Sequence, residues 1–182
     1  MDDRRRRFEA QVLPHLDAAY RFARWLARSP ADAEDVVQEA MLRAYRGFDG
    51  LRGSDVKAWL LAIVRNCHST ALRQQRQHGV LVPLPEEHDS GAVPALVAST
   101  LEPEDESIRR DERLTLERLI AALPEDYREV LVLREIEELS YREIAEATQV
   151  PIGTVMSRLA RARLALKRQW SGQLEGSSRA VP

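Results

Sequence analysis

The sequence has very little of what secreted and membrane proteins usually carry. One cysteine, Cys67, stands among 182 residues, which excludes an internal disulfide framework. No apolar run approaches the roughly 20 residues that a membrane-spanning helix needs. The opening residues MDDRRRRFEA also lack the apolar stretch of a signal peptide. We therefore expect a cytoplasmic protein without membrane insertion.

Nucleotide, metal and catalytic motifs are also missing. No glycine-rich phosphate-binding motif is present. The histidines that follow Cys67, namely His68, His78 and His88, match no usual zinc-ligand spacing. The acidic residues of segment 32–39 fall on a capped, solvated helix, and nothing nearby suggests the desolvated cleft that acid–base catalysis would need. We expect no enzymatic activity, no cofactor, no metal and no small-molecule substrate.

Two segments lack acidic residues altogether. Residues 56–85 and 151–174 contain no Asp or Glu, whereas the stretch between them, 77–107, holds seven acidic residues and no Lys or Arg. Two basic surfaces separated by an acidic connector predict two contacts with a polyanion. The net charge of −2 argues against tight, indiscriminate DNA binding by the free chain.

The composition and the hydrophobic periodicity together predict an all-α protein. Aromatic residues make up 5% and apolar residues 44% of a chain that is long enough for one ordinary domain or two small ones. Ser29 and Pro30 are typical of a helix start. Expected helices run over about 5–28 with a possible break at Pro14, from 30 to a glycine-containing loop at 47–53, and over 54–77, 108–122 and 125–137.

Prolines and acidic residues divide the chain. Four of the nine prolines fall between residues 79 and 107, where few apolar residues keep a helical period. We expect two small helical domains, 1–77 and 108–172, joined by a flexible acidic linker, 78–107. A frayed polar tail, 173–182, would follow.

The stretch LSYREIAEATQVPIGTVMSRLARAR, residues 139–163, reads as two short helices joined by a tight turn. Ser140 and Glu143 form a capping box at the start of the first helix, and Thr154 is the expected N-cap of the second. Gln149 occupies a turn position where glycine often relieves a left-handed conformation. This layout is that of a helix-turn-helix, whose second helix enters the major groove of DNA.

The second helix of this motif has one apolar face and one basic face. Val155, Leu159, Ala162 and Leu166 share the apolar face at about 100° per residue. Arg161 is a candidate guanine reader, because a guanidinium matches the two acceptors of guanine. The remaining candidates for DNA contact are Thr154, Met156, Ser157, Arg158, Ala160, Arg163 and Lys167. The alternative to a DNA-binding motif is an ordinary amphipathic helical hairpin whose basic face is only solvated.

Three strings together resemble one family, the extracytoplasmic-function sigma factors of bacterial RNA polymerase. DAEDVVQEAMLRAYRGF resembles the helix by which they bind core polymerase. WLLAIVRN resembles the helix that meets the minus-ten promoter element, and LPEDYREVLVLREIEELSYREIAEATQVPIGTVMSRLARARLAL resembles their fourth conserved region. The resemblance covers about residues 8–76 and 108–170. It implies a sigma region 2 helical bundle, followed by a sigma region 4 helix-turn-helix that recognises the minus-thirty-five promoter element.

This resemblance implies three partners: core RNA polymerase, promoter DNA and an anti-sigma factor that holds the chain inactive. The core polymerase contact would be made by Asp32, Asp35, Gln38, Glu39 and Arg43. Carboxylates and an amide on a rigid helix can pair with Arg and Lys across a polar interface. The acidic linker would thread the RNA-exit path of the polymerase.

The resemblance also implies that two segments contact the minus-ten element. A loop centred on Leu51, Arg52 and Gly53 would receive a flipped base, and flipping requires a receiving pocket to offset its cost of a few kcal/mol. The third helix would contribute Arg65, Asn66, Ser69 and Arg73. Thr70 departs from the family pattern, since many relatives carry an acidic or amide residue there.

Two other classes of protein fit parts of the pattern. A conventional helix-turn-helix regulator would bind operator DNA without polymerase, but it needs a dimerisation face, and no sustained heptad or additional apolar helix offers one. A helical adaptor would use the acidic helix for protein binding alone. Substitution of Arg158 and Arg161 by alanine would leave an adaptor unaffected.

Overall fold

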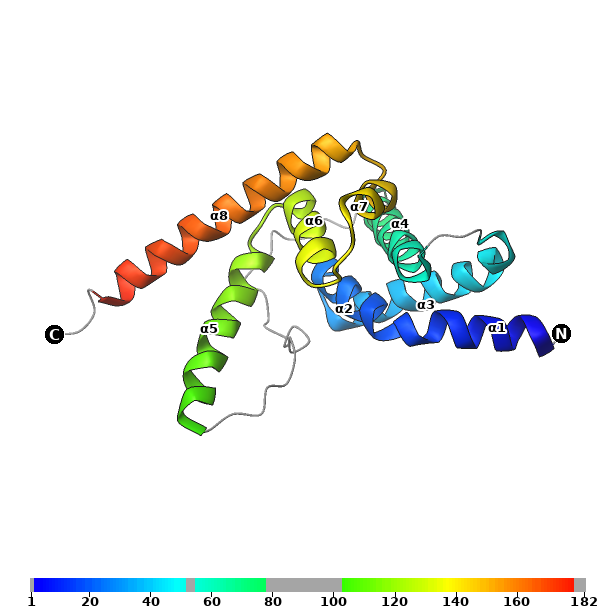
Figure 1. The fold of residues 1–182 in the computed structure, drawn as a ribbon, viewed down its shortest axis with the longest axis horizontal. Helices are drawn as coiled ribbons and strands as arrows, with labels where there is room; N and C mark the ends of the chain where they lie inside the picture. The colour runs from blue at the N-terminus through cyan, green and yellow to red at the C-terminus, as the bar shows by residue number, and fades with distance from the viewer. Residues whose placement is uncertain (1, 52–54, 78–102, 179–182) are drawn as a thin grey trace.

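The computed structural model of the chain describes residues 2–51, 55–77 and 103–178. Every regular element in these ranges is a helix, which confirms the all-α class (Figure 1). The α-helices are α1 (Asp2–Val12), α2 (Leu16–Leu26), α3 (Pro30–Gly47), α4 (Val56–Gln77), α5 (Pro103–Ala121), α6 (Glu125–Glu135), α7 (Tyr141–Thr148) and α8 (Ile152–Ser178), with 3-10 helices η1 (Leu13–His15) and η2 (Phe48–Gly50). The predicted contacts Arg52 and Gly53 and the linker segment 78–102 lie outside the described residues.

The first four α-helices form an N-terminal unit that follows the sequence pattern closely. Pro14 interrupts the expected first helix, because proline has no N–H to donate, and η1 separates α1 from α2. At the start of α3 the Ser29 hydroxyl accepts a hydrogen bond from the Asp32 N–H at 3.1 Å, and Pro30 takes the first helical position. Val12, Phe22 and other apolar side chains of these helices are fully buried.

The last four helices form a C-terminal unit whose ends differ from the prediction. Helix α5 begins at Pro103, before the expected start at 108, because proline suits the first turn of a helix and no glycine or further proline follows until Pro124. Helix α8 continues to Ser178, through the tail expected to fray from 173. Gly172 and Gly176 cost only about 1 kcal/mol each in a helix rich in Ala, Leu, Arg and Lys.

The two units share one core. A single cluster of buried apolar side chains includes Phe22 and Leu61 from the N-terminal unit and Val132 and Ile144 from the C-terminal unit. Helix α7 lies against α4, and α6 lies against α2 (Figure 1). The expected minus-ten face of α4 is therefore partly covered by the C-terminal unit.

Candidate nucleic-acid interface

Capping groups fix both ends of α7, the helix that precedes the turn into α8. The Ser140 N–H donates to the Glu143 carboxylate at 2.7 Å, and the Glu143 N–H donates to the Ser140 hydroxyl at 3.3 Å, which confirms the capping box. Gln149 ends α7 in the left-handed region at φ 58°, and its side-chain amide donates to the Glu146 carbonyl at 2.7 Å. This local hydrogen bond offsets part of the strain that a non-glycine residue bears there.

The start of α8 corrects one expectation. The Pro151 carbonyl accepts hydrogen bonds from the N–H groups of Thr154 at 2.8 Å and Val155 at 3.1 Å. Because the N-cap residue supplies the first carbonyl acceptor of a helix, Pro151 takes that position and Thr154 lies within the first turn. The helix thus begins earlier than predicted, at Ile152, and Thr154 is half-buried there.

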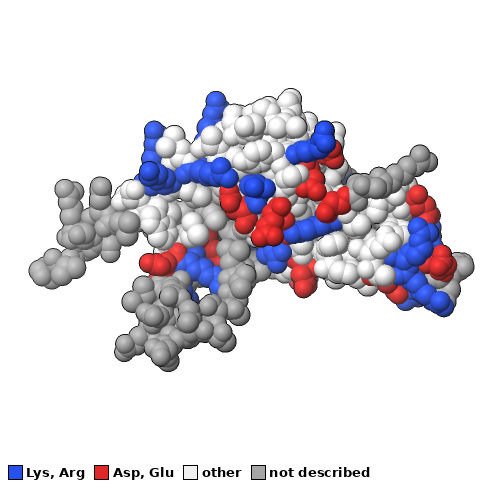
Figure 2. Space-filling model, in the orientation of Figure 1, with Lys and Arg blue, Asp and Glu red and all other residues white. Residues whose placement is uncertain are grey.

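The buried face and the exposed face of α8 are those that the hydrophobic periodicity predicted. Val155, Leu159 and Ala162 are buried, and Leu166 packs against the core from the same side. The outward face carries Met156, Ser157, Ala160, Arg161, Arg163 and Lys167, which are exposed. Lys and Arg side chains gather along the α8 side of the molecule (Figure 2).

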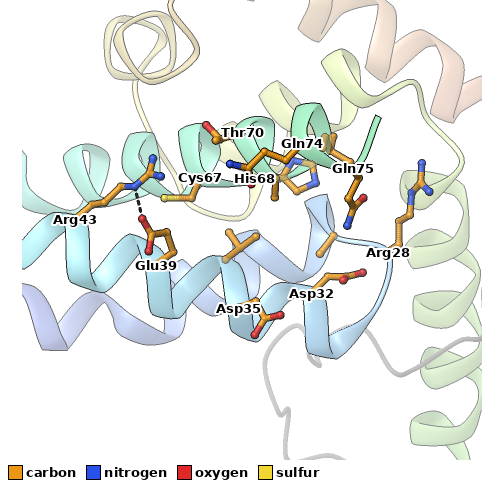
Figure 3. Close-up of a pocket in the computed structure, with 14 residues that line it drawn as sticks. Arg28, Asp32, Asp35, Glu39, Arg43, Cys67, His68, Thr70, Gln74 and Gln75 are labelled. Atoms are coloured by element: carbon orange, nitrogen blue, oxygen red, sulfur yellow. Dashed lines mark hydrogen bonds and ion pairs between the residues drawn. The ribbon is translucent and has the colours of Figure 1, made fainter. Parts of the chain in front are cut away.

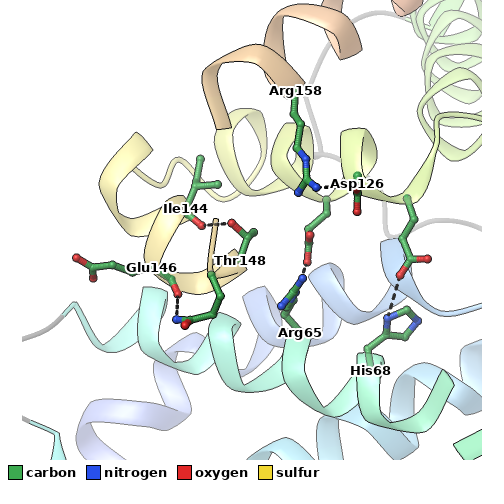
Figure 4. A network of polar contacts seen from close by, with 10 residues as sticks. Arg65, His68, Asp126, Ile144, Glu146, Thr148 and Arg158 are labelled. Carbon is green, nitrogen blue, oxygen red and sulfur yellow. Dashed lines mark hydrogen bonds and ion pairs between the residues drawn. The ribbon is translucent and has the colours of Figure 1, made fainter. Parts of the chain in front are cut away.

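Two of the α8 arginines are held by acidic side chains of α6. Arg158 donates to the Asp126 carboxylate at 2.6 Å (Figure 4), and Arg163 donates to Glu135 at 2.6 Å. Exposed ion pairs of this kind contribute about 0–1 kcal/mol, so a phosphate group can displace the carboxylate. Arg161 lies between these two arginines in the sequence, and its side chain is exposed. It can therefore reach the edge of a base.

The predicted minus-ten residues of α4 do not all face the same surroundings. Asn66 and Arg73 are exposed and Ser69 is half-buried. Arg65 was expected to project away from the N-terminal core, and it does so, but it points at α6 and donates to the Glu129 carboxylate at 2.8 Å (Figure 4). Leu51 is partly buried and packs against the core.

Four of the five predicted polymerase-binding residues line a groove of about 360 Å³ between α3 and the end of α4. Asp32, Asp35, Glu39 and Arg43 contribute to its wall (Figure 3), and Gln38 is exposed on the same helix. The Arg43 guanidinium donates to Glu39 at 2.6 Å, and this hydrogen bond raises the pKa of Arg43. Cys67 also lines this groove, and burial raises the pKa of its thiol.

Sequence reasoning missed the polar contacts that Glu137 makes between the two units. Glu137 is 1% exposed and is bound by Arg21 and Lys57. Arg21 lies 116 residues away in the sequence and Lys57 lies 80 residues away. No local spacing could identify such partners, because a pattern read along one helix reports only which face that helix buries.

The family models for the two halves of one class of transcription factor match this chain. The model described as Sigma-70 region 2 matches residues 12–78, and the model described as Sigma-70, region 4 matches residues 113–166. These segments contain α2 to α4, α6 and α7, together with about the C-terminal half of α5 and the N-terminal half of α8. The class is therefore that of the sigma factors.

Similarity to individual proteins narrows the class to one family. The chain is 38% identical over 140 residues to the ECF RNA polymerase sigma-E factor of Escherichia coli K12, covering 74% of this chain and 72% of that protein. It is 35% identical over 158 residues to the ECF RNA polymerase sigma factor SigE of Mycolicibacterium smegmatis, covering 86% of this chain and 58% of that protein. The chain belongs to the extracytoplasmic-function sigma factors.

A solved structure agrees with this assignment. The sigma factor RpoE from Bartonella quintana, crystallised with the anti-sigma factor NepR, aligns with a TM-score of 0.70 and 28% identity. The alignment covers 90% of this chain and 96% of that one. Within residues 2–51, 55–77 and 103–178, none of the helices is both long enough and apolar enough to cross a bilayer.

Proposed function

We propose that this chain is an alternative sigma factor that binds core RNA polymerase, recognises two promoter elements and directs the start of transcription. The observation that carries the proposal is α8: its buried Leu159 face fixes it against the C-terminal core, and its exposed face carries Arg161 and Lys167. A capping box at Ser140 starts α7, and Gln149 ends α7 at the turn that leads into α8. The family relationship supplies the polymerase as the partner that a DNA-binding helix alone would not imply.

In this proposal each part of the chain has one role. The C-terminal domain, 108–172, binds the minus-thirty-five element, with Arg161 reading a base and with Arg158, Arg163 and Lys167 on the phosphate backbone. The N-terminal domain, 1–77, binds the minus-ten element through Asn66, Ser69 and Arg73. The remaining assigned contacts are Thr154, Met156, Ser157 and Ala160 for the first element and Leu51, Arg52, Gly53 and Arg65 for the second.

Helix α3 is the proposed polymerase-docking helix. Asp35 and Gln38 are exposed, and Glu39 and Arg43 form an i,i+4 pair on the same helix. Such a polar surface on a rigid helix suits an interface that pairs charges with a basic partner. The protein would act in the cytoplasm beside the polymerase, without enzymatic activity, cofactor or metal of its own.

An anti-sigma factor is the proposed regulator. The structural relative with a TM-score of 0.70 was crystallised with such a protein. A bound anti-sigma factor would keep the polymerase and the promoter from these surfaces, and its removal would release the chain for transcription.

Run-off transcription with purified core polymerase and a genomic promoter library tests this function. Defined transcripts should appear only when the chain is added, and the shared sequences upstream of their starts give both promoter elements. Asp35→Lys should reduce capture of core polymerase. Glu34→Lys, which makes the same charge reversal at a neighbouring exposed position, should not reduce it. A chain that binds operator DNA tightly without polymerase would instead be a conventional regulator.

A further inference from the structure

A buried carboxylate of the C-terminal unit is held by two basic side chains of the N-terminal unit. The side chain of Glu137, which follows α6, has 0% exposure. Arg21 of α2 binds both of its oxygens, with Nε donating at 2.7 Å and Nη2 at 3.0 Å. Lys57 of α4 lies 3.1 Å from one of these oxygens and also donates to the Glu137 backbone carbonyl at 2.7 Å.

A second ion pair lies along the same side of α4. Arg65 donates to the Glu129 carboxylate at 2.8 Å, and the Glu129 side chain is only 6% exposed. Burial raises the pKa of Glu129, and the neighbouring Arg65 lowers it in opposition. We call Arg21, Lys57, Arg65, Glu129 and Glu137 the interdomain ion-pair cluster.

The basic half of this cluster has the composition of a phosphate-binding surface. Two arginines and a lysine come from one face of the N-terminal unit, and each keeps 24–31% of its side chain exposed. A guanidinium binds a carboxylate and a phosphate with the same two-pronged geometry. Arg65 also begins an i, i+4, i+8 row with Ser69 and Arg73, two residues assigned above to promoter DNA.

We propose that Arg21, Lys57 and Arg65 bind the phosphate backbone of promoter DNA, and that Glu137 and Glu129 occupy this surface in place of phosphate while the two units are closed on each other. The inference rests on the proposed function for the identity of the DNA. It adds Arg21 and Lys57 to the DNA-binding surface and makes the C-terminal unit a competitor for that surface. DNA or polymerase binding must then separate α6 and α7 from α2 and α4.

The competition follows from the charges and the burial. The two carboxylates are tethered to the same chain, so their local concentration at the basic surface is far higher than that of a free ligand. Both are shielded from solvent, which strengthens their hydrogen bonds relative to exposed ones. Removing one carboxylate leaves partly buried cations without that partner, and they regain full hydration, or a phosphate partner, when the units separate.

Binding of a fluorescent oligothymidylate to the full chain at low salt tests the inference, because this probe presents phosphates without promoter sequence. Glu137→Gln should raise the affinity by roughly tenfold, the size expected for the loss of a charge-assisted hydrogen bond. The control is Glu138→Gln, which removes the same charge at the adjacent exposed position and should change affinity far less. Small-angle scattering should show a larger radius of gyration for the Glu137→Gln variant than for the wild-type chain, and no such increase for the Glu138→Gln control.

Further variants separate the basic surface from a general effect of charge. Adding Arg21→Gln to Glu137→Gln should remove most of the gain, whereas adding Arg46→Gln, an exposed position on α3, should not. Glu129→Gln is the second test if Glu137→Gln loses its helical circular dichroism, since burial already disfavours the charged form of Glu129. It should give a gain in the same direction.

The inference is overturned if the two glutamine variants bind the probe no better than Glu138→Gln, or if the gain survives Arg21→Gln. These outcomes are distinct from failure of the proposed function. A wild-type chain that directs transcription while Glu137→Gln shows no gain overturns only the competition. A chain that directs no transcription overturns the proposed function, and the probe measurement still decides whether the surface binds phosphate.

Discussion

Two leucines of α8 offer the sharpest test of which face of this helix points at the core. Leu159 is 1% exposed and Leu164 is 49% exposed, so the same change to alanine can be made on opposite faces of one helix. Leu159→Ala removes the equivalent of about three methylene groups, or about 2.4 kcal/mol at ~0.8 kcal/mol each. The cavity that remains raises the expected loss of unfolding free energy to about 3 kcal/mol.

Leu164→Ala should have a much smaller effect. Water already reaches about half of this side chain, so no closed cavity forms, and the higher helix propensity of alanine offsets a few tenths of a kcal/mol. We expect a loss of about 1 kcal/mol or less. The difference between the two variants is therefore about 2 kcal/mol.

Equilibrium unfolding in urea, followed by far-ultraviolet circular dichroism, measures both variants on the same scale. In thermal unfolding the Leu159→Ala variant should melt about 6–12 °C lower, given about 2–4 °C per kcal/mol for a chain of this size. Equal losses, or a larger loss for Leu164→Ala, would mean that α8 is rotated about its axis. The assignment of Arg161 to the DNA-facing side would then be wrong.

Three further predictions concern the interface, the turn and pH. Arg161→Ala should weaken promoter binding by the polymerase complex by about 1–3 kcal/mol if it reads a base, with Arg46→Ala as the unaffected control in the same band-shift assay. Ser140→Ala should lower the unfolding free energy by about 1 kcal/mol through loss of the α7 cap, whereas Ser157→Ala on exposed α8 should be near neutral in the same urea titration. Burial lowers the pKa of His68, so the unfolded state binds more protons once pH falls below the ordinary value of 6.5, and stability should fall with it. The urea midpoint should therefore drop as pH falls from about 7 to about 5, and His68→Gln should flatten that drop.

The helices and the recognition motif were predictable because their signals are local. Pro14 breaks the first helix, and Ser140 with Glu143 starts α7. The period of Val155, Leu159 and Ala162 identifies the buried face of α8. Each of these signals lies within a few residues of the structure that it specifies, so a single sequence is enough to read it.

The relation between the two halves was not predictable from the sequence. An acidic segment rich in proline suggested two separate bodies, yet α4 packs against α7 and one apolar core joins them. Glu137 stands in a run of acidic residues that reads as solvated surface, and only its distant partners Arg21 and Lys57 explain its burial. Arg65 was correctly placed on the polar side of α4, but its contact with Glu129 depends on the same tertiary packing.

The reactivity of the single thiol, Cys67, reports how often α3 and α4 separate. Cys67 is 4% exposed, and the burial that raises its pKa keeps it in the unreactive protonated form. A maleimide reagent should therefore modify Cys67 only when α3 and α4 transiently separate. A partner that holds these two helices together should slow the alkylation, so the alkylation rate of the native protein reports binding of that partner without an engineered label.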